Sequence, residues 1–484
     1  MQTASIPDPS PADFEPSLQA RLWRWMDQKL LEFPGLVEGR HQGPRQKLQG
    51  WQIIAGLTAQ CLHRCGSLEH IMRRYFAVRL SSSALSQRRA HMQLEPFTTV
   101  MRHALRPMAR PDQHPDCFFA GLLLVGIDGI QFDLLNTPQI NAQVAKVRTR
   151  RAEAAFAKLS ASVLVELGTH APLGVAMDFG PMSEKALIEP LWESLPEKSL
   201  LILDRYYGQA PMLQELQKHC ATRSSHFLVR VRDKLNVKVQ QPCGDGSAQV
   251  TVTLREREPV PAEDAGQPAP AEPASRTRGR PRKHPPQKVS SLTVREVRGK
   301  MRCGNGQWAE VRLWTSLSEQ QACAQQLLEL YARRWEQELF YKELKLQVNQ
   351  GSLLAGQRTE TAAQQVAAMM IACSLLAEER LAVAAVSPDQ AVRQAGALRI
   401  SFAMCQEYVA ALFLVLQSSE GLMDKQAQGE LVRRVRVQIA EAALPPRRLR
   451  SCQRRVRRPV DKWPRMMKPT SLPNPRNFTI TNIA

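Results

Sequence analysis

The sequence contains no apolar run of the length that a membrane-spanning helix requires. The best candidate, Val366 to Ala377, is too short and instead predicts a buried helix. The N-terminus lacks the basic start and apolar core of a signal peptide. The ten cysteines include no Cys-x2-Cys pair, and Cys61 and Cys65 have no second pair at zinc-site spacing. We therefore expect a cytoplasmic protein with reduced thiols and no membrane partner.

Several familiar catalytic patterns are also absent. The sequence has no P-loop, no Gly-x-Gly-x2-Gly loop and no Ser-His-Asp triad. Positive charge, in contrast, is in excess, with 65 Lys and Arg against 45 Asp and Glu, a net charge of +20. Residues 431–484 alone contain 14 Lys or Arg against two acidic residues. This imbalance favours a polyanionic partner, either nucleic acid or an anionic membrane surface.

The 484 residues suggest about three structural units, and the apolar pattern divides them further. Residues 118–232 predict three strands, a helix, a strand, a helix and a strand, which matches the ribonuclease H-like layout. We expect an α/β fold in which this core is interrupted by a mostly β insertion and flanked by helical regions. The predicted segments are a helical region at 1–115, the first part of the core at 118–232, the insertion with a basic loop at 233–316, the second part of the core with further helices at 317–430, and a basic tail at 431–484.

Two short helices are expected inside the N-terminal region. The first spans Leu68–Phe76, and the second follows a turn, with Ser82 or Ser83 as its N-cap. A helix-turn-helix places polar side chains of its second helix in the DNA major groove, so residues 1–115 are interpreted as a DNA-binding domain. The alternative is a helical hairpin with a solvated polar face. The candidate DNA contacts are Gln87, Arg88 and Arg89.

Two aspartates follow apolar runs that predict buried strands. Asp128 comes after LLLVGI, and Asp204 comes after LLIL, so both are expected at strand ends. A carboxylate is costly there unless it is paired or liganded, and strand ends at the rim of a sheet are common places for sites. The alternative is a solvated residue where each strand emerges from the core. Asp133, Asp178 and Glu184 are nearby acids that could support such a site, although capping or surface roles suit Asp178 and Glu184 better.

One predicted helix, within YARRWEQELFYKELK, aligns four polar side chains. Tyr331, Arg334, Glu338 and Lys345 lie at offsets of 3, 4 and 7, which on a regular helix form one stripe. The alternative is a solvated face held by ion pairs such as Arg334 with Glu338, each worth about 0.3–0.5 kcal/mol.

This Tyr-x2-Arg-x3-Glu-x6-Lys pattern resembles the signature of the DDE transposases of the "insertion sequence four" family. The family also has an Asp-Gly after its first core strand, like Asp128-Gly129, and an Asp-Arg after a later strand, like Asp204-Arg205. It typically carries a β insertion before the glutamate, and SSSALSQRR resembles its N-terminal region. The resemblance covers roughly Ser67 to Arg380.

The resemblance implies that Asp128, Asp204 and Glu338 bind two Mg2+ ions, with Mn2+ as a possible substitute. It implies cleavage and strand transfer at terminal inverted repeats by a bacterial protein that is associated with the nucleoid when bound to DNA. The expected partner is double-stranded DNA, held by a homodimer in a synaptic complex. A hairpin intermediate is left open, as are two alternatives: an inactive DNA-binding relative, and a ribonuclease H-like nuclease without strand transfer.

The same resemblance implies that Tyr331, Arg334 and Lys345 contact DNA phosphates. An aromatic face can also hold a flipped base, with core packing as the alternative. The candidates for base stacking are Trp308, Trp314 and Trp335. In the insertion, Arg-Gly-Arg-Pro resembles an AT-hook that lies in a narrow minor groove. Its candidate DNA contacts are Arg278 and Arg280, with Gly279 and Pro281 completing the motif.

Overall fold

The computed structural model describes residues 18–26, 28–33, 36, 48–63, 66–148, 153–180, 184–232, 237–257, 287–302, 308–351, 353–419 and 421–446. Most of them belong to one compact unit, made of residues 1–299 and 311–447. A second unit comprises residues 300–310 and 448–484, of which only 300–302 and 308–310 are described. The basic tail beyond residue 446 and the loop at 258–286 therefore lie outside the described residues.

The described N-terminal residues form short helices. The predicted helix at Leu68–Phe76 is confirmed with the same bounds. The second predicted helix begins at Ser82, but its N-cap is Ser81 and not Ser82 or Ser83, because the Ser81 hydroxyl accepts a 3.3 Å hydrogen bond from the amide of Ala84. The helices are α1 (Leu18–Trp23), α2 (Gln28–Leu31), α3 (Gly50–Leu62), α4 (Leu68–Phe76), α5 (Ser82–Ala90) and α6 (Glu95–Ala104).

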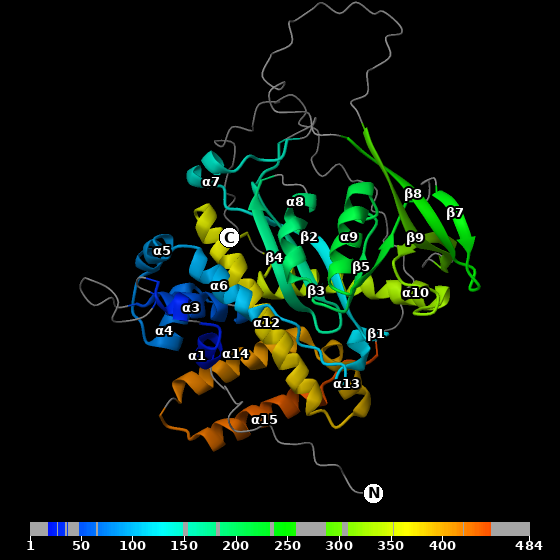
Figure 1. The fold of residues 1–484 in the computed structure, drawn as a ribbon. Helices are drawn as coiled ribbons and strands as arrows, with labels where there is room; N and C mark the ends of the chain where they lie inside the picture. The colour runs from blue at the N-terminus through cyan, green and yellow to red at the C-terminus, as the bar shows by residue number, and fades with distance from the viewer. Residues whose placement is uncertain are drawn as a thin grey trace, which may run out of the picture. The chain divides into compact units, whose positions relative to one another are not determined.

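A ten-stranded mixed sheet follows (Figure 1). Its path runs β4-β3-β2-β5-β6-β10-β9-β8-β7, and β1 pairs with β2 off this path. β5 is parallel to both β2 and β6, whereas the pairs β2–β3, β3–β4 and β6–β10 are antiparallel. The strands are β1 (Phe118–Phe119), β2 (Leu122–Asp133), β3 (Lys158–Glu166), β4 (Ala171–Phe179), β5 (Ser199–Leu203), β6 (His226–Arg230), β7 (Val237–Pro242), β8 (Ala248–Arg257), β9 (Gln287–Arg302) and β10 (Trp308–Thr315).

The later helices cover this sheet or form the C-terminal region. Together with the sheet they make a mixed α/β architecture with helical termini, which confirms the predicted fold class. The helices are α7 (Pro138–Gln143), α8 (Glu184–Ile188) with a 3-10 continuation (Glu189–Ser194), α9 (Ala210–Thr222), α10 (Ala324–Leu330), α11 (Trp335–Glu343), α12 (Thr359–Ala385), α13 (Gln390–Ala395), α14 (Phe402–Ser418) and α15 (Lys425–Glu441).

The strands of the predicted insertion, β7 to β10, prolong the core sheet. β10 pairs with the core strand β6, with Trp314 opposite Val229. Val250 of β8 and Val294 of β9 join the same apolar cluster as the core strands. The insertion therefore continues the sheet beyond β6 and shares its core.

Alternating side chains divide the sheet into two apolar faces. Leu123 and Val125 of β2 belong to a cluster with residues of α8 and α9, whereas Leu122 and Leu124 belong to a cluster with residues of α10. The core strands are thus covered by helices on both faces (Figure 1). Odd-numbered residues in this part of β2 face α8 and α9, and even-numbered residues face the opposite side.

The 27-residue helix α12 is the centre of the helical part of the unit. It includes the predicted buried helix Val366 to Ala377, and it packs against α3, α6, α14 and β4. Near its end, the buried carboxylate of Glu379 pairs with Arg21 of α1 and with Arg436 of α15. Glu379 thereby ties the first and last described helices to α12.

None of the single helices within the described ranges has the length and apolar character needed to cross a membrane. The segments Gln390–Arg399 and Phe402–Ser418 meet that test only as a pair, which is bent by 85°.

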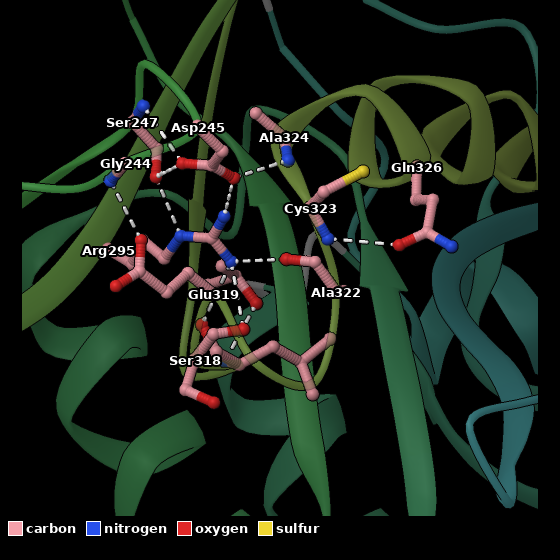
Figure 2. Close-up of polar contacts among 12 residues, drawn as sticks. Gly244, Asp245, Ser247, Arg295, Ser318, Glu319, Ala322, Cys323, Ala324 and Gln326 are labelled. Atoms are coloured by element: carbon pink, nitrogen blue, oxygen red, sulfur yellow. Dashed lines mark hydrogen bonds and ion pairs between the residues drawn. The ribbon is translucent and has the colours of Figure 1, made fainter.

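A buried arginine joins the insertion to the segment before α10 (Figure 2). Arg295 of β9 is 1% exposed and pairs with Asp245 in the turn between β7 and β8. Its guanidinium also donates to the carbonyl oxygens of Ser318 at 3.0 Å and Ala322 at 2.7 Å. Asp245 in turn accepts a 2.6 Å hydrogen bond from the amide of Ala324, the first residue of α10. The insertion therefore fixes the start of α10, which leads directly into the Tyr331–Lys345 segment.

Removing this arginine is expected to destabilise the protein. Arg295→Met leaves Asp245 without its partner and several carbonyl groups without a donor, which should cost about 3–5 kcal/mol. Arg298→Met is the matched control on the same strand, because its side chain is 68% exposed and its ion pair should contribute about 1 kcal/mol or less. Urea unfolding of both variants measures the difference, and equal losses of stability would contradict this role of Arg295.

Candidate active site

The register of β2 and β5 sets the two predicted aspartates at the same level. Val125 lies opposite Leu201 in this parallel pair, and the same register carried three residues further sets Asp128 opposite Asp204. Neighbouring strands are about 4.8 Å apart. Alternation along β2 places Asp128 on the even-numbered face, where Leu122 and Leu124 belong to a cluster with residues of α10.

One part of the sequence interpretation was wrong: Asp128 does not lie at a strand end. β2 continues to Asp133, and Asp128 pairs with Val163 of β3. β5, however, stops at Leu203, immediately before Asp204. Asp128 therefore lies in the part of β2 that extends beyond the end of β5. Here β2 still pairs with β3 on one side, but it has no strand partner on the β5 side, and this leaves room for a site.

The third predicted acid, Glu338, lies on α11. The four motif positions do not lie on one regular helix as expected, because Tyr331 and Arg334 belong to a 3-10 turn and Lys345 belongs to a π-helical turn (Leu344–Val348). Only Glu338 is in the α-helix itself. Changes in helix type alter side-chain directions, so the sequence offsets alone do not define their common face.

The inner side of α11 is packed against β2 and β3. A β-carbon at Gly126 would lie 2.9 Å from Oε1 of Gln337, so the glycine allows this side chain to approach the strand closely. The side-chain amide of Gln337 donates to the backbone carbonyl oxygen of Val163, and the hydroxyl of Tyr341 donates to the backbone carbonyl oxygen of Asp128. α11 is therefore anchored directly to the backbone that carries Asp128.

A buried histidine in the turn between β3 and β4 also contacts α11. His170, in the turn between β3 and β4, is 1% exposed, and its two ring nitrogens contact Glu336 at 3.0 Å and Glu343 at 2.6 Å. Arg380 of α12 lies 3.6 Å from Glu343. Because Glu336 and Glu343 flank Glu338 in sequence, this network fixes the helix segment that bears the candidate catalytic acid.

Arg334 connects the predicted acids electrostatically. Its guanidinium pairs with Glu338 and lies 3.8 Å from Asp128. Burial raises the pKa of Asp128 to about 6, and the negative charge of Asp204 adds to this effect. The charge of Glu338 also raises the pKa of this carboxyl, so Asp128 lies within electrostatic reach of both Asp204 and Glu338.

The donor set suits hard divalent cations, because carboxylate oxygens are the ligands that Mg2+ and Mn2+ prefer. Among the described side chains, however, no three acidic, His or Cys groups are already arranged as a closed metal cage. Arg334 contacts two of these acids, Asp128 and Glu338, and neutralises part of their charge.

A fourth acid lies at this place, where sequence reasoning favoured a cap or surface role. Glu184 opens α8, and its carboxylate fills the space beside Gly129, where an added β-carbon would overlap Oε1. Burial raises the pKa of Glu184 to about 7, and the charges of Asp128 and Asp204 contribute. Glu184 is partly exposed and lies in the first turn of α8, as expected for an acid at a helix start, and it also lies near Asp128 and Asp204. The only sequence signal was its place just after a core strand, which it shares with Asp204.

The other two nearby acids have local roles. The carboxylate of Asp133 pairs with Lys158 on the adjacent strand. Asp178 lies in β4 with an exposed side chain, as expected for a surface residue, and accepts a 2.7 Å hydrogen bond from the amide of Phe179.

The predicted DNA contacts near the site differ in accessibility. Tyr331 is partly buried, and burial raises its pKa to about 12. Lys345 is exposed, and Trp335 is 48% exposed. Trp314 was wrongly included for base stacking: it is fully buried and its indole donates a 2.7 Å hydrogen bond to Glu296, so core packing is its role. The side chain of Trp308, together with Arg278 and Arg280, lies outside the described residues.

The three candidate DNA contacts on α5 also differ in how exposed their side chains are. Gln87 is exposed and Arg88 is partly buried. Arg89 was wrongly predicted as a DNA contact, because its side chain is buried and donates to Gln364 Oε1 at 3.1 Å and to the carbonyl oxygen of Thr361. Arg89 thus joins α5 to α12.

Comparison with known proteins identifies the class. Residues 138–376 match the family model described as the transposase DDE domain. The matched segment includes Asp204 and Glu338 and begins after Asp128. This match and the mixed α/β fold support a DDE transposase as the class of the protein.

A search of curated proteins found a relative that indicates one family of DDE transposases. The transposase InsG for insertion sequence element IS4 from Escherichia coli (strain K12) is 22% identical over 399 residues. These residues are 80% of this chain and 78% of the relative. The two matches support a DDE transposase of the insertion sequence four family, which is the family that the motif resembles.

The raised pKa of Asp128 gives a testable pH dependence. Its usual value is near 4, so between about pH 4 and 6 the folded chain binds this proton more tightly than the unfolded chain does. The contribution of Asp128 to stability therefore falls as pH rises through this range. Asp128→Asn should raise the melting temperature of the metal-free protein near neutral pH, with the gain disappearing toward about pH 4.

Thermal unfolding in the presence of a chelator measures this effect. Asp133→Asn, on the same strand but paired with Lys158, is the control and should not give the same pH-dependent gain. A lower melting temperature for Asp128→Asn at neutral pH would contradict the assigned charge repulsion.

Proposed function

We propose that this transposase binds the terminal inverted repeats of its own element and moves it by metal-dependent strand cleavage and strand transfer. The observation that carries the proposal is the convergence of Asp128, Asp204 and Glu338 within a transposase fold. We further propose that the active chain is a homodimer, because a cut-and-paste reaction must hold two element ends together. We place the activity in the bacterial cytoplasm, where the chain associates with the nucleoid through its DNA substrate.

The three acids are proposed to hold two divalent cations, Mg2+ or Mn2+. Such ions supply charge stabilisation at the attacking and leaving oxygens of a phosphodiester. The chain itself contributes rigid placement: β2 and β5 set the level of the aspartates, and Gln337, Tyr341 and His170 fix α11. The phosphate must enter where β5 ends, since the sheet is open there.

Arg334 is proposed to change partners on DNA binding. In the structure its guanidinium pairs with Glu338 and lies 3.8 Å from Asp128. If bound cations compensated the charge of these acids, the guanidinium would be available for bidentate contact with a phosphate. Lys345 and Trp335 lie on or beside the same helix segment with exposed side chains, and we propose them as further phosphate and base contacts.

One assay distinguishes the three alternatives that the sequence leaves open: a transposase, a nuclease without strand transfer and an inactive DNA-binding relative. Full-length protein is incubated with Mg2+, DNA carrying the element ends taken from the gene's flanks, and target DNA. Glu338→Gln should lower cleavage at least about 100-fold while DNA binding persists, because it removes a metal-binding charge and leaves the surface intact. Glu329→Gln, an exposed acid on α10, is the matched control.

Joined end–target products identify a transposase. Cleavage without joined products would favour a ribonuclease H-like nuclease, and binding without cleavage by folded protein would favour an inactive relative. Cleavage that survives Glu338→Gln at the level of Glu329→Gln would contradict the proposed active site.

A further inference from the structure

One buried histidine contacts two acids of α11 at the same time. His170 is 1% exposed and lies in the turn between β3 and β4. Its Nδ1 lies 2.6 Å from the carboxylate of Glu343, and its Nε2 lies 3.0 Å from the carboxylate of Glu336. Both polar atoms of the ring are therefore committed to α11.

The turn that carries this histidine is fixed independently of α11. His170 has a left-handed backbone, with a φ of 62°, and its amide donates a 2.9 Å hydrogen bond to the carbonyl oxygen of Glu166. The buried Glu166 carboxylate in turn accepts hydrogen bonds from the amides of Met108 and Ala109 and from the hydroxyl of Thr169. The imidazole thus projects toward α11 from a rigid support.

The number of protons on the ring follows from its two contacts. A neutral imidazole has one N–H donor and one lone pair, and the lone pair would repel a carboxylate oxygen. An imidazolium has two N–H groups and donates to Glu336 and Glu343 together. The alternative is a neutral ring beside one protonated acid, but Arg380, 3.6 Å from Glu343, favours the ionised form of that acid. With both acids ionised, His170 and Arg380 balance their charges, as buried ions require.

The electrostatics of the surroundings agree with a doubly protonated ring. Burial lowers the pKa of His170, but the charge of Glu343 and the hydrogen bonds to Glu336 and Glu343 outweigh it. The pKa is therefore raised above its usual value, although the charge of Arg380 from α12 acts in the opposite direction. A raised pKa means that these contacts stabilise the fold fully below about pH 6.5 and lose that effect as pH rises through the raised value.

The two acids lie on the side of α11 that faces away from Glu338. Glu336 and Glu343 are seven residues apart, which is about two turns of the helix. Glu338 follows Glu336 by two residues and therefore points about 200° away from it. The contacts of His170 thus limit rotation of α11 about its own axis, and such a rotation would displace Glu338.

We propose that His170 is a positioning residue for the transposase reaction, which holds α11 as a doubly protonated imidazolium and thereby sets the place of Glu338. This inference rests on the proposed function, because it assumes that Glu338 acts in strand cleavage. His170 acts only through α11, from the opposite side of the helix. A neutral ring would hold only one of the two acids and would leave α11 less firmly placed.

Nitrogen NMR of the full-length chain with 15N-labelled histidine rings tests the protonation state. The ring signals of His170 are those that disappear in His170→Gln, and at neutral pH both nitrogens should have the chemical shift of a protonated nitrogen. Glu343→Gln removes the charge that most favours the imidazolium and should lower the pKa of His170. A His170 ring with one unprotonated nitrogen at neutral pH would overturn the proposal.

Cleavage of element-end DNA measures the effect on the reaction. His170→Gln should lower the cleavage rate at saturating DNA about 10- to 100-fold, because Glu338 is then misplaced, whereas the affinity for the DNA should not change. His219→Gln is the matched control, since His219 also pairs with a glutamate, Glu215, but on α9. It should cleave normally. If His170→Gln does not fold, the cleavage test passes to Glu343→Gln, which keeps an acceptor for the ring and should slow cleavage several-fold.

Glu338→Gln separates this inference from the proposed function. If Glu338→Gln blocks cleavage and His170→Gln cleaves like His219→Gln, the role of His170 is overturned and the proposed function stands. A loss of DNA affinity that accounts for the whole effect of His170→Gln overturns its role as well. If Glu338→Gln cleaves normally, or if the unaltered chain does not cleave, both proposals are overturned. Slow cleavage by folded His170→Gln with unchanged DNA affinity, and a doubly protonated ring in the unaltered chain, support both.

Discussion

The structure depends on a concentration of negative charge at the point where β5 ends and β2 continues. Asp128 of β2, Asp204 just after β5, Glu184 of α8 and Glu338 of α11 lie near one another, and their partial burial makes mutual repulsion unfavourable. Arg334 compensates for only part of this charge. A fold that keeps such a cluster has to hold it with rigid neighbours, and those neighbours account for much of the surrounding architecture.

The supports converge on the two strands and on α11. Gly126 and Gly129 open the surface of β2 on alternate faces, and Gln337 and the Glu184 carboxylate use the two openings. His170 and Arg380 hold the acids that flank Glu338 in α11. Further along the chain, Arg295 links the inserted strands to the start of α10. The insertion therefore supports the segment that leads into the motif, in addition to prolonging the sheet.

Much of the core could be predicted from the sequence because the signals are local. Apolar runs mark the strands before Asp128 and Asp204, and the spacing around Glu338 is specific enough to indicate the family. What could not be predicted depends on contacts between distant residues. Glu184 looks like an ordinary acid at a helix start until the β2 and β5 registers bring the aspartates beside it. Arg89 and Trp314 carry polar groups that suit DNA, and only their buried partners, Gln364 and Glu296, reveal structural roles.

The central claim is that these acids form one cation site, and a crystal structure of the full-length chain with Mn2+ tests it most directly. The account predicts anomalous scattering peaks about 2.1 Å from carboxylate oxygens of Asp128 and Asp204, with Arg334 moved away from Glu338. Well-diffracting crystals with bound Mn2+ elsewhere, and with the Arg334–Glu338 pair unchanged, would contradict it.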